Sequence, residues 1–465
     1  MDIALIPLLQ LTDLKQCTIL GENSEIIQSK YKKFFELKNV ESWDNRKLRV
    51  GIIGTGIISD LNYLGYYYSD DAEIVSVANI DKNEAIEKLK KWNLRKVRVY
   101  TDYKKMVDKE DLDIIEILTP HHLHYSMTEY CANAGVPGIS VQKPMAHTIT
   151  DCVKMIEICK EQNVKLKIFE NFRFYPVYVR AKELLDQGII GERLNFRINT
   201  IGTGGPSWPV GLDSYLWRIN IDMCGGGPWI YDDGQHKFSV ALWLMDEERV
   251  EKVYSWIDYF TGVMDVPANI FWKYPSKNSD DPPKYGTMEF SLAPNVYYPS
   301  NYYGCDEFIE ISGTRGIMWI NQSNSGGNFV SKSPQYPPIV VYANGEVKTY
   351  GEDLPRDWKY SFINSTEHFI ELIKSGKGEP IYTGEQGKNL CIFAKMPYIS
   401  DQRREIVYWE EITAENEEKG FCTVEKSEDA DESGLSKYGR RIRKDLRKGI
   451  KQGLKHKKFI YEFEQ

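Results

Sequence analysis

The fold of this 465-residue chain is decided by one stretch, Leu48-Arg49-Val50-Gly51-Ile52-Ile53-Gly54-Thr55-Gly56-Ile57-Ile58-Ser59. Its apolar run 48–53 is typical of a short buried strand, and the glycines break the chain before a helix expected from about Ile57. In such a turn Gly54 permits a tight bend, Gly56 lets the backbone approach a pyrophosphate, and Ser59 is small enough for helix–strand packing. The stretch therefore predicts a dinucleotide-binding turn at a helix N-terminus.

The alternation of strands and helices continues to about residue 168. The segments expected to form further strands are 73–78, 113–118 and 138–141, with a helix at 83–92. This order predicts an α/β domain with a doubly wound parallel sheet of the Rossmann type. Beyond residue 169, longer alternating segments occur, such as 193–198, 253–257 and 308–311. They favour an α+β domain with a large, open, mostly antiparallel sheet.

The length of the chain indicates more than one domain, because a single hydrophobic core rarely serves beyond roughly 250–300 residues. The parts that we expect are an N-terminal extension (1–46), a dinucleotide-binding Rossmann domain (47–168), a substrate-binding domain (169–410), and an acidic linker with a basic tail (411–465). No internal repeat interrupts this order.

Composition and cysteine usage favour a soluble, cytoplasmic protein. The chain is 42% hydrophobic and 27% charged, and no stretch approaches the roughly 20 apolar residues of a membrane span. Its N-terminus lacks the basic region and cleavage site of a signal peptide. The eight cysteines are scattered without a Cys-x-x-Cys pair, so we expect a reducing compartment and no disulfide framework.

The net charge of −8 conceals a strongly basic tail. Residues 437–458 contain eleven Lys or Arg and one Asp, a local charge of +10, so the rest of the chain carries −18. Four apolar residues recur at every fourth position there: Ile442, Leu446, Ile450 and Leu454. A basic amphipathic helix of this kind could bind nucleic acid or an anionic membrane surface. We favour an arm that docks on an acidic body, its own or a neighbouring subunit's in a homo-oligomer, since nothing else resembles a nucleic-acid module.

The end of the second expected strand bears on the identity of the dinucleotide. An acidic residue usually stands there and accepts the ribose hydroxyls, but this chain has Asn79, with Asp81 two residues on. Asn79 can still pair with a hydroxyl, Asp81 would repel a 2′-phosphate, and Lys82 would attract one. We therefore expect NAD, with NADP as the alternative.

Two more strand ends carry residues suited to a ligand, because ligands bind at the carboxyl ends of parallel strands. The third strand leads into Thr119-Pro120-His121-His122-Leu123-His124. Three histidines suggest a metal, but no Cys or carboxylate accompanies them at ligand spacing, so we expect a loop that lines the cofactor and no metal. The fourth strand leads into Gln142-Lys143-Pro144, where the lysine could stabilise a developing alkoxide or simply remain exposed before a turn.

A second glycine-rich stretch precedes a buried helix and reads Gly225-Gly226-Gly227-Pro228-Trp229-Ile230-Tyr231-Asp232-Asp233-Gly234-Gln235-His236. Asp232 and His236 are four residues apart, so a carboxylate and an imidazole would share one face if the helix has begun by then. Such a pair can hold and transfer a proton near neutral pH. The alternative is an N-capping Asp and a core His.

These motifs, in this order, resemble the glucose–fructose oxidoreductase/inositol dehydrogenase (Gfo/Idh/MocA) family of nicotinamide-dependent sugar dehydrogenases over roughly residues 47–408. Thr119-Pro120-x-x-x-His124 and Lys143-Pro144 are similar to the family's T-P-x-x-x-H and E-K-P signatures. The segments similar to its later motifs are 171–176, 188–192, Trp217-Arg218 and 313–316.

The resemblance implies a role for each matching residue. Lys143 would contact the reacting hydroxyl and the nicotinamide region, His236 would be the general base, and Asp232 would orient the sugar or the histidine. The residues implied to hold the cofactor are Gly54, Thr55, Gly56, Ile57, Ile58, Asn79, Asp81, Thr119, Pro120, His121, His124, Gln142 and Lys143. The residues implied to contact the substrate are Lys143, Arg173, Tyr175, Trp208, Trp217, Asp232 and His236.

The sequence departs from the family pattern at two places. Gln142 stands where E-K-P has a glutamate, which removes a charge beside Lys143. Four residues, instead of the usual three, separate Gly227 from Asp232, which could reset the start of the helix.

The sequence favours an NAD(P)-dependent oxidoreductase that transfers a hydride to or from a secondary hydroxyl of a sugar, glycoside or inositol. The 3-hydroxyl of a glycoside is one candidate. A second alternative keeps NAD bound and uses transient oxidation to cleave a glycosidic bond. A third is a non-catalytic dinucleotide-binding regulator, against which the joint presence of Lys143, Asp232 and His236 argues.

Overall fold

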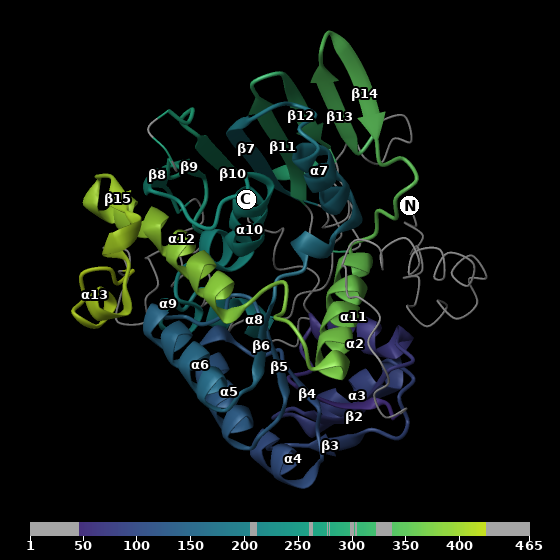
Figure 1. The fold of residues 1–465 in the computed structure, drawn as a ribbon. Helices are drawn as coiled ribbons and strands as arrows, with labels where there is room; N and C mark the ends of the chain where they lie inside the picture. Colours follow the sequence, from purple (N-terminus) through teal and green to yellow (C-terminus); the bar gives the residue numbers. More distant parts are fainter. Residues whose placement is uncertain are drawn as a thin grey trace, which may run out of the picture.

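The computed structural model describes residues 46–204, 212–259, 264–276, 278, 280–297, 302, 305–321 and 337–424. The N-terminal extension up to residue 45, the basic tail and the predicted pocket residue Trp208 lie outside these described residues. Within them the chain forms two sheets with helices packed around both (Figure 1). None of the helices described is both long enough and apolar enough to span a membrane.

The first sheet has six strands, all parallel, and confirms the doubly wound sheet that the sequence predicts. In spatial order its strands are β3 (Arg98–Tyr100), β2 (Ala72–Ala78), β1 (Leu48–Ile53), β4 (Ile114–Ile117), β5 (Gly138–Gln142) and β6 (Lys165–Phe169). The helices that connect them are α2 (Ser59–Tyr68), α3 (Lys82–Lys91), α4 (Tyr103–Lys109), α5 (His124–Asn133) and α6 (Ile149–Glu161). The central strand β1 is almost wholly buried, because helices cover both faces of such a sheet.

Strand β6 is not predicted from the sequence, because two lysines alternate with its apolar residues. Lys167 is nevertheless 1% exposed, and its Nζ donates to the carbonyl of Ser365 at 2.5 Å. Its ammonium also lies 4.6 Å from the centre of the Phe169 ring. Burial lowers the pKa of Lys167 to about 7, although Glu116 on the same sheet opposes the shift. Tertiary contacts therefore bury a lysine that the pattern would leave at the surface.

The second sheet has nine strands and is open and mostly antiparallel, as predicted. In spatial order its strands are β14 (Glu346–Tyr350), β13 (Ile339–Ala343), β12 (Gly316–Ile320), β11 (Cys305–Gly313), β7 (Arg193–Gly204), β10 (Tyr285–Tyr297), β9 (Ala268–Lys273), β8 (Lys252–Ile257) and β15 (Val407–Tyr408). Among the described strand pairs of this sheet, β7 and β10 alone run parallel. The helices between the two sheets are α7 (Pro176–Asp186), α10 (Gly234–Leu244) and α12 (Gly384–Arg403) (Figure 1).

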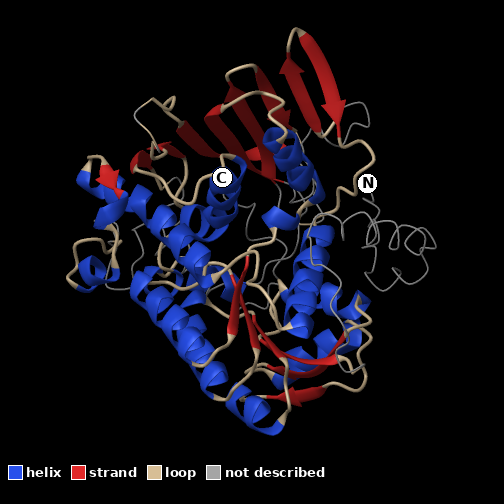
Figure 2. Cartoon of the chain, in the orientation of Figure 1, coloured by secondary structure: helices blue, strands red, loops and turns tan. Residues whose placement is uncertain are grey.

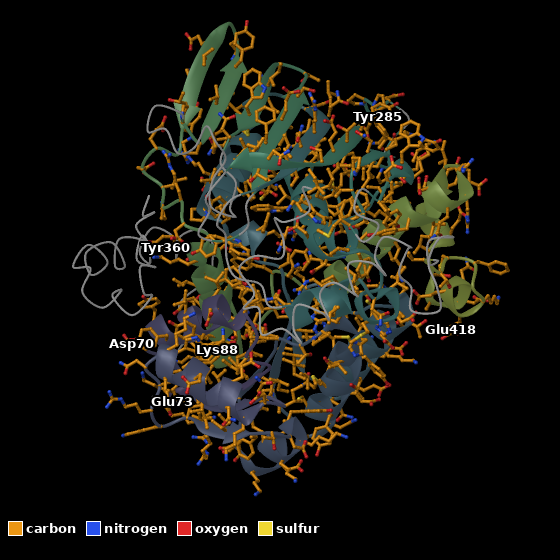
Figure 3. The ribbon with its side chains drawn as sticks, turned by 180° about the vertical axis from the view of Figure 1, so that it is seen from behind. Asp70, Glu73, Lys88, Tyr285, Tyr360 and Glu418 are labelled. Atoms are coloured by element: carbon orange, nitrogen blue, oxygen red, sulfur yellow. The ribbon has the colours of Figure 1, made fainter. Side chains whose placement is uncertain are left out.

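The opposite face of the second sheet carries no helix in the described part of the chain (Figure 2). Trp256, Phe271, Tyr285 and Tyr342 are exposed there. Figure 3, seen from behind, shows Tyr285 on this sheet, far from Lys88 on the first domain. Within the residues that the structure describes, this aromatic face is uncovered, whereas helices lie over the face that is turned toward the first sheet (Figure 1).

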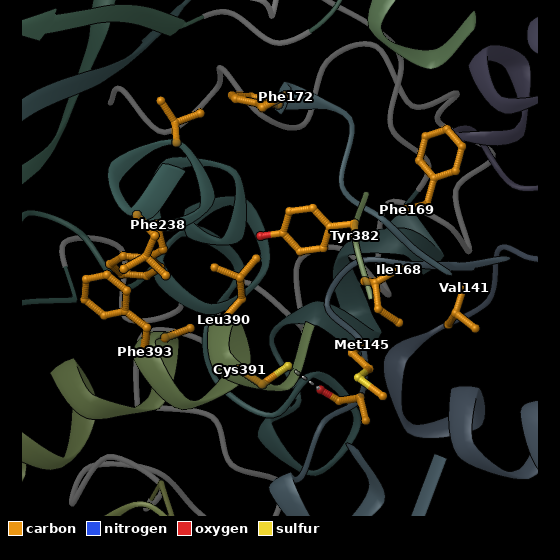
Figure 4. Close-up of a cluster of buried hydrophobic side chains, with 14 of the residues drawn as sticks. Val141, Met145, Ile168, Phe169, Phe172, Phe238, Tyr382, Leu390, Cys391 and Phe393 are labelled. Atoms are coloured by element: carbon orange, nitrogen blue, oxygen red, sulfur yellow. Dashed lines mark hydrogen bonds between the residues drawn. The ribbon is translucent and has the colours of Figure 1, made fainter. Parts of the chain in front are cut away.

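Two helices late in the chain tie the sheets together. Helix α11 (Lys359–Ser375) packs against α2, and α12 packs against α6. Tyr382, Leu390 and Cys391 share a buried cluster with Met145 and Ile168 (Figure 4). The first sheet is therefore covered in part by helices from the last part of the second domain.

Candidate active site

The glycine turn between β1 and α2 leaves an open cradle. Gly54 has a φ of +94°, and a Cβ there would meet the Leu118 carbonyl oxygen at 2.7 Å, so glycine is required. A Cβ at Gly56 would find nothing within 4 Å. No described side chain caps α2, whose N-cap residue is Ile58. The open space at Gly56, at the start of a helix, fits the close approach of a dinucleotide pyrophosphate.

Asn79 is held beside this cradle by two neighbours. Its Nδ2 donates to Thr55 Oγ1 at 2.5 Å and to Glu84 Oε2 at 3.2 Å. Asp81 is the N-cap of α3 and accepts the N–H groups of Asn83 and Glu84. The end of β2 has Asn79 where a carboxylate is usual, and the structure brings the Glu84 carboxylate to this position. Glu84 is not among the residues predicted from the sequence.

His124 joins the two loops that follow β4 and β5. It is fully buried, with Nε2 2.8 Å from the Thr119 carbonyl and Nδ1 3.1 Å from the Pro144 carbonyl. Burial lowers the pKa of His124 to about 3, so the ring stays neutral. His124 thus fixes the loops that carry Thr119 and Lys143, and it does so with both ring nitrogens engaged.

His121 begins the short 3-10 helix η2 (His121–Leu123) and faces the site. Its Nδ1 bonds to the Cys224 carbonyl at 2.8 Å, and its Nε2 lies 3.5 Å from Asp232 Oδ1. Burial lowers the pKa of His121, an effect that Asp232 opposes. Among the described residues, no cluster of ligating side chains has the arrangement of a metal site.

Lys143 and Asp232 form the charged centre of the site. Lys143 Nζ donates to Asp232 Oδ1 at 2.8 Å and to the Asp232 carbonyl at 2.9 Å. Asp232 Oδ2 accepts from Arg218 Nε at 2.6 Å, at the end of α8 (Leu212–Arg218). Burial would raise the pKa of Asp232, but Lys143 and Arg218 hold it well below its usual range. Asp232 is therefore a permanent anion that fixes two cations, not a proton acceptor.

Gln142 supports the backbone of Lys143. Its Oε1 accepts the N–H of Lys143 at 2.9 Å, and its Nε2 donates to Asn62 Oδ1 at 3.4 Å. The Gln142 amide therefore forms its hydrogen bonds within the first domain and, because it is neutral, adds no charge near the Lys143 ammonium.

A π turn absorbs the extra residue after Gly227. In η4 (Pro228–Asp233) the N–H of Asp232 donates to the Gly227 carbonyl, five residues back, at 3.3 Å. Helix α10 then begins at Gly234. A one-residue insertion widens a helix locally in this way. The regular helix therefore begins only after Asp232, so the condition for Asp232 and His236 to share one α-helical face is not met, and no hydrogen bond joins their side chains.

The triple glycine is required by its surroundings. Gly225 has a φ of +93°, in the left-handed region. A Cβ on Gly227 would overlap the buried carboxylate of Asp265. Asp265 accepts the N–H groups of Trp229 at 2.9 Å and Ile230 at 2.8 Å. These two hydrogen bonds fix the turn that carries Asp232.

His236 has a carboxylate partner that the sequence analysis also missed. Its Nδ1 lies 2.6 Å from Oε2 of Glu170, which is fully buried directly after β6. The imidazole stacks on the ring of Phe172, with centroids 4.0 Å apart and planes 6° from parallel. Burial lowers the pKa of His236, Glu170 opposes this shift, and the charge of Lys143 adds to it. The alternating lysines of β6 conceal the strand that Glu170 follows, so the sequence pattern gives no signal for this residue.

Trp217 lies beside the charged centre. Its ring is 4.6 Å from that of His121 in an edge-on arrangement, and the guanidinium of Arg218 lies 4.2 Å from it. The aromatic surface and the Arg218–Asp232 pair therefore adjoin each other.

The structure excludes Tyr175 from the predicted pocket wall and leaves Arg173 partly exposed. Tyr175 is fully buried, and its hydroxyl donates to the Arg356 carbonyl at 2.9 Å, so it cannot line an accessible pocket. Arg173 packs over the ring of Tyr382 at 4.6 Å. Both residues pack in the second domain, because an aromatic or arginine in a linking segment is as useful for packing as for binding.

The geometry brings an ammonium, a neutral imidazole and the glycine cradle to one region. A Cβ on Gly54 would lie 3.3 Å from Thr119, which His124 in turn connects to the loop of Lys143. Such a set can accept a hydroxyl proton and stabilise the oxyanion beside a bound dinucleotide.

Known protein families match both halves of the chain. Residues 48–170 match the model described as oxidoreductase family, NAD-binding Rossmann fold, and residues 178–319 match the GFO/IDH/MocA C-terminal domain. Levoglucosan dehydrogenase of Pseudarthrobacter phenanthrenivorans is 28% identical over 211 residues, or 43% of this chain and 52% of that enzyme. Myo-inositol 2-dehydrogenase of Thermotoga maritima is 24% identical over 369 residues, or 78% of this chain and 99% of that enzyme.

A solved structure shows the same fold. Levoglucosan dehydrogenase in complex with NADH and levoglucosan superposes with a TM-score of 0.63 at 20% identity, over 78% of this chain and 99% of that one. The sequence match to the Pseudarthrobacter enzyme spans about half the length of that relative. The two family models together span more than half of the chain. The chain belongs to the Gfo/Idh/MocA family and is an NAD(P)-dependent oxidoreductase.

Proposed function

We propose that this chain is a dehydrogenase that exchanges a hydride between NAD and a secondary hydroxyl of a sugar, glycoside or inositol. The observation that carries the proposal is the Lys143 ammonium, fixed 2.8 Å from Asp232, close to a His236 imidazole whose pKa is lowered. Residues 47–168 would bind the dinucleotide, and residues 169–410 would contribute His236 and the walls around the substrate.

The residues of the chain handle the proton and the developing charge. Lys143 has three N–H donors, two of which point at Asp232, so one remains for the substrate oxygen. His236 accepts the hydroxyl proton while Lys143 stabilises the negative oxygen. When bound, NAD supplies the acceptor for the hydride that leaves the carbinol carbon as its carbonyl forms. Reduction is the reverse, with His236 returning the proton.

We propose NAD over NADP as the cofactor. Glu84 reaches Asn79 at 3.2 Å, where the strand end meets the expected ribose position, and Asp81 stands beside it as a helix cap. Two carboxylates near a 2′-phosphate would repel it, whereas Glu84 and Asn79 can both bond to ribose hydroxyls.

The names of the relatives support the substrate class, since levoglucosan, D-apiose and myo-inositol are each a sugar or a polyol. The test is NADH absorbance with the purified chain, NAD and a panel of sugars, glycosides and inositols. NADH formation that depends on the sugar supports the proposal. Glycoside cleavage without net NADH formation would favour the redox cleavage of a glycosidic bond. No reaction with any compound of the panel would favour a non-catalytic dinucleotide-binding regulator.

We also propose a cytoplasmic homo-oligomer. The seven cysteines in the described residues are all free, as suits a reducing compartment. The uncovered face of the second sheet exposes Trp256, Phe271 and Tyr285, which a second copy could bury. Light scattering coupled to size exclusion tests this: a single-chain mass at assay concentration would exclude the oligomer.

A further inference from the structure

His236 is held from two sides by one short segment. Glu170 reaches Nδ1 of the imidazole at 2.6 Å, and Phe172 stacks on its face at 4.0 Å. Glu170 Oε1 also accepts the N–H of Phe172 at 2.7 Å, which closes the segment on itself. The Glu170 carboxylate and the Phe172 ring therefore hold the His236 imidazole together, and both oxygens of the carboxylate accept or share a hydrogen bond.

The chemistry of this contact selects one tautomer of His236. An ionised carboxylate only accepts hydrogen bonds, so Nδ1 must carry the proton that it donates to Glu170. The other nitrogen, Nε2, is then an acceptor with a lone pair. In a catalytic imidazole, the partner of one nitrogen decides which nitrogen handles the proton.

Asp232 cannot perform this task, although the family pattern places it four residues before His236. Its Oδ1 accepts from Lys143 at 2.8 Å and its Oδ2 from Arg218 at 2.6 Å. Glu170 is 0% exposed and has no cation at ion-pair distance among the described residues, so its strong contact is with the imidazole.

We propose that Glu170 is the positioning residue that makes His236 the proton acceptor, by holding its imidazole in the Nδ1–H tautomer with Nε2 directed to the substrate. The inference rests on the proposed dehydrogenase function. In the oxidative step the hydroxyl proton moves to Nε2, the electron pair of the C–H bond leaves with its hydrogen as hydride, and the C=O bond forms. Glu170 stabilises the imidazolium that results.

The charged groups around the imidazole set the expected pH dependence. Glu170 follows β6, Lys143 follows β5, and Asp233 lies in the turn before α10. Burial lowers the pKa of His236, Glu170 and Asp233 raise it, and Lys143 lowers it. Loss of the Glu170 charge therefore lowers the pKa further, and the acid limb of kcat/KM, which follows the neutral base, moves to lower pH.

Glu170→Gln is the decisive variant. The Gln carbonyl can keep the bond from the Phe172 N–H, which turns the amide N–H₂ toward Nδ1 and forces the proton onto Nε2. The variant should lose roughly 100-fold or more in kcat, the lower end of what general acid–base catalysis contributes. Glu170→Asp should recover part of that loss and restore the acid limb toward that of the wild type.

A matched control separates positioning from loss of a buried carboxylate. Glu307 is also buried, and it lies 2.7 Å from Lys237, the residue directly after His236. Glu307→Gln should leave the acid limb in place. NADH affinity, measured by fluorescence, should stay within about twofold of the wild type in all of these variants.

A readout without turnover tests the tautomer itself. In the chain labelled with ¹⁵N-histidine, His236 is assigned by the signal that disappears in His236→Gln. A protonated Nδ1 and an unprotonated Nε2 in the wild type, exchanged in Glu170→Gln, are the expected result. The opposite tautomer in the wild type, or an unchanged acid limb and kcat in Glu170→Gln, would overturn the role of Glu170. Failure of the dehydrogenase proposal is distinguishable, because the wild type would then show this tautomer without oxidising any sugar.

Discussion

Lys143 and Asp232 form an ion pair with an Nζ–Oδ1 distance of 2.8 Å, although 89 positions separate them in the chain. The two side chains are 14% and 8% exposed, so the pair is largely shielded from water. Lys143 comes from the end of a strand in the first domain, and Asp232 comes from a π turn in the second. Their meeting, together with that of His121 and the Cys224 carbonyl, joins the two halves of the chain at the candidate site.

Lys143→Ala should abolish most of the turnover and leave NADH binding nearly intact. In the proposed mechanism the ammonium stabilises the reacting oxygen, whereas the glycine cradle and the strand ends hold the dinucleotide. Steady-state kinetics and fluorescence titration with NADH measure the two effects separately. Lys165→Ala, which removes a surface partner of Glu379, is the control. Turnover equal to the wild type would remove Lys143 from the mechanism.

Asp232→Asn should destabilise the chain by roughly 3 kcal/mol at pH 7, the lower end for a buried ion pair, because it leaves two partly buried cations without their counterion. The pKa of Asp232 is held well below its ordinary value of about 3.9, so its contribution is complete above that pH and disappears as the pH falls through the lowered pKa. Urea denaturation should therefore show a gap between wild type and variant that narrows below about pH 4.

The control for Asp232→Asn is Asp71→Asn, which removes an exposed partner of Lys374. Asp71 is 53% exposed, and surface pairs contribute little, so its loss should cost less than about 1 kcal/mol. A gap for Asp232→Asn no larger than that of this control would contradict the role of Asp232 as an anchor.

Gly56→Ala should separate folding from cofactor binding. A Cβ there meets nothing within 4 Å, so the melting temperature should change little, but the methyl group would occupy the space where a pyrophosphate approaches. NADH affinity should fall by roughly tenfold or more, equivalent to about 1.4 kcal/mol. In Gly54→Ala, by contrast, the new Cβ would meet the Leu118 carbonyl at 2.7 Å at a φ of +94°, so the melting temperature itself should fall. Unchanged NADH affinity in Gly56→Ala would place the dinucleotide elsewhere.

Glu84→Gln should raise the affinity for NADPH relative to NADH. The substitution removes the carboxylate that reaches Asn79 at 3.2 Å and keeps a side chain that can bond to a ribose hydroxyl. Fluorescence titrations with both reduced cofactors measure the ratio without any substrate. Glu87→Gln on the exposed side of the same helix, where Glu87 pairs with Lys90, is the control. A ratio that changes equally in both variants would assign the preference to overall charge.

Much of the first domain follows from local sequence. The run 48–53 and its glycines specify β1 and the cradle, because an apolar strand and a left-handed turn residue leave few other structures available. Strand β6 is different. Its lysines alternate with apolar residues, a pattern typical of a half-exposed strand, and the burial of Lys167 depends on contacts with Ser365 and the Phe169 ring. Patterning also cannot distinguish a buried Tyr175 from a pocket wall, because the partner of its hydroxyl is 181 positions away.

The sequence by itself determined which chemical groups this protein carries and where the dinucleotide turn lies, since both depend on neighbours along the chain. It also identified Lys143, Asp232 and His236 as one set through their resemblance to a family. Only the tertiary structure decided their pairing. Asp232 contacts Lys143 and Arg218, while His236 contacts Glu170, because Asp232 lies in the π turn, His236 lies in α10, and the residue directly after β6 supplies a second carboxylate. Contacts between distant segments depend on how the two sheets pack against each other, and no local sequence pattern encodes that packing.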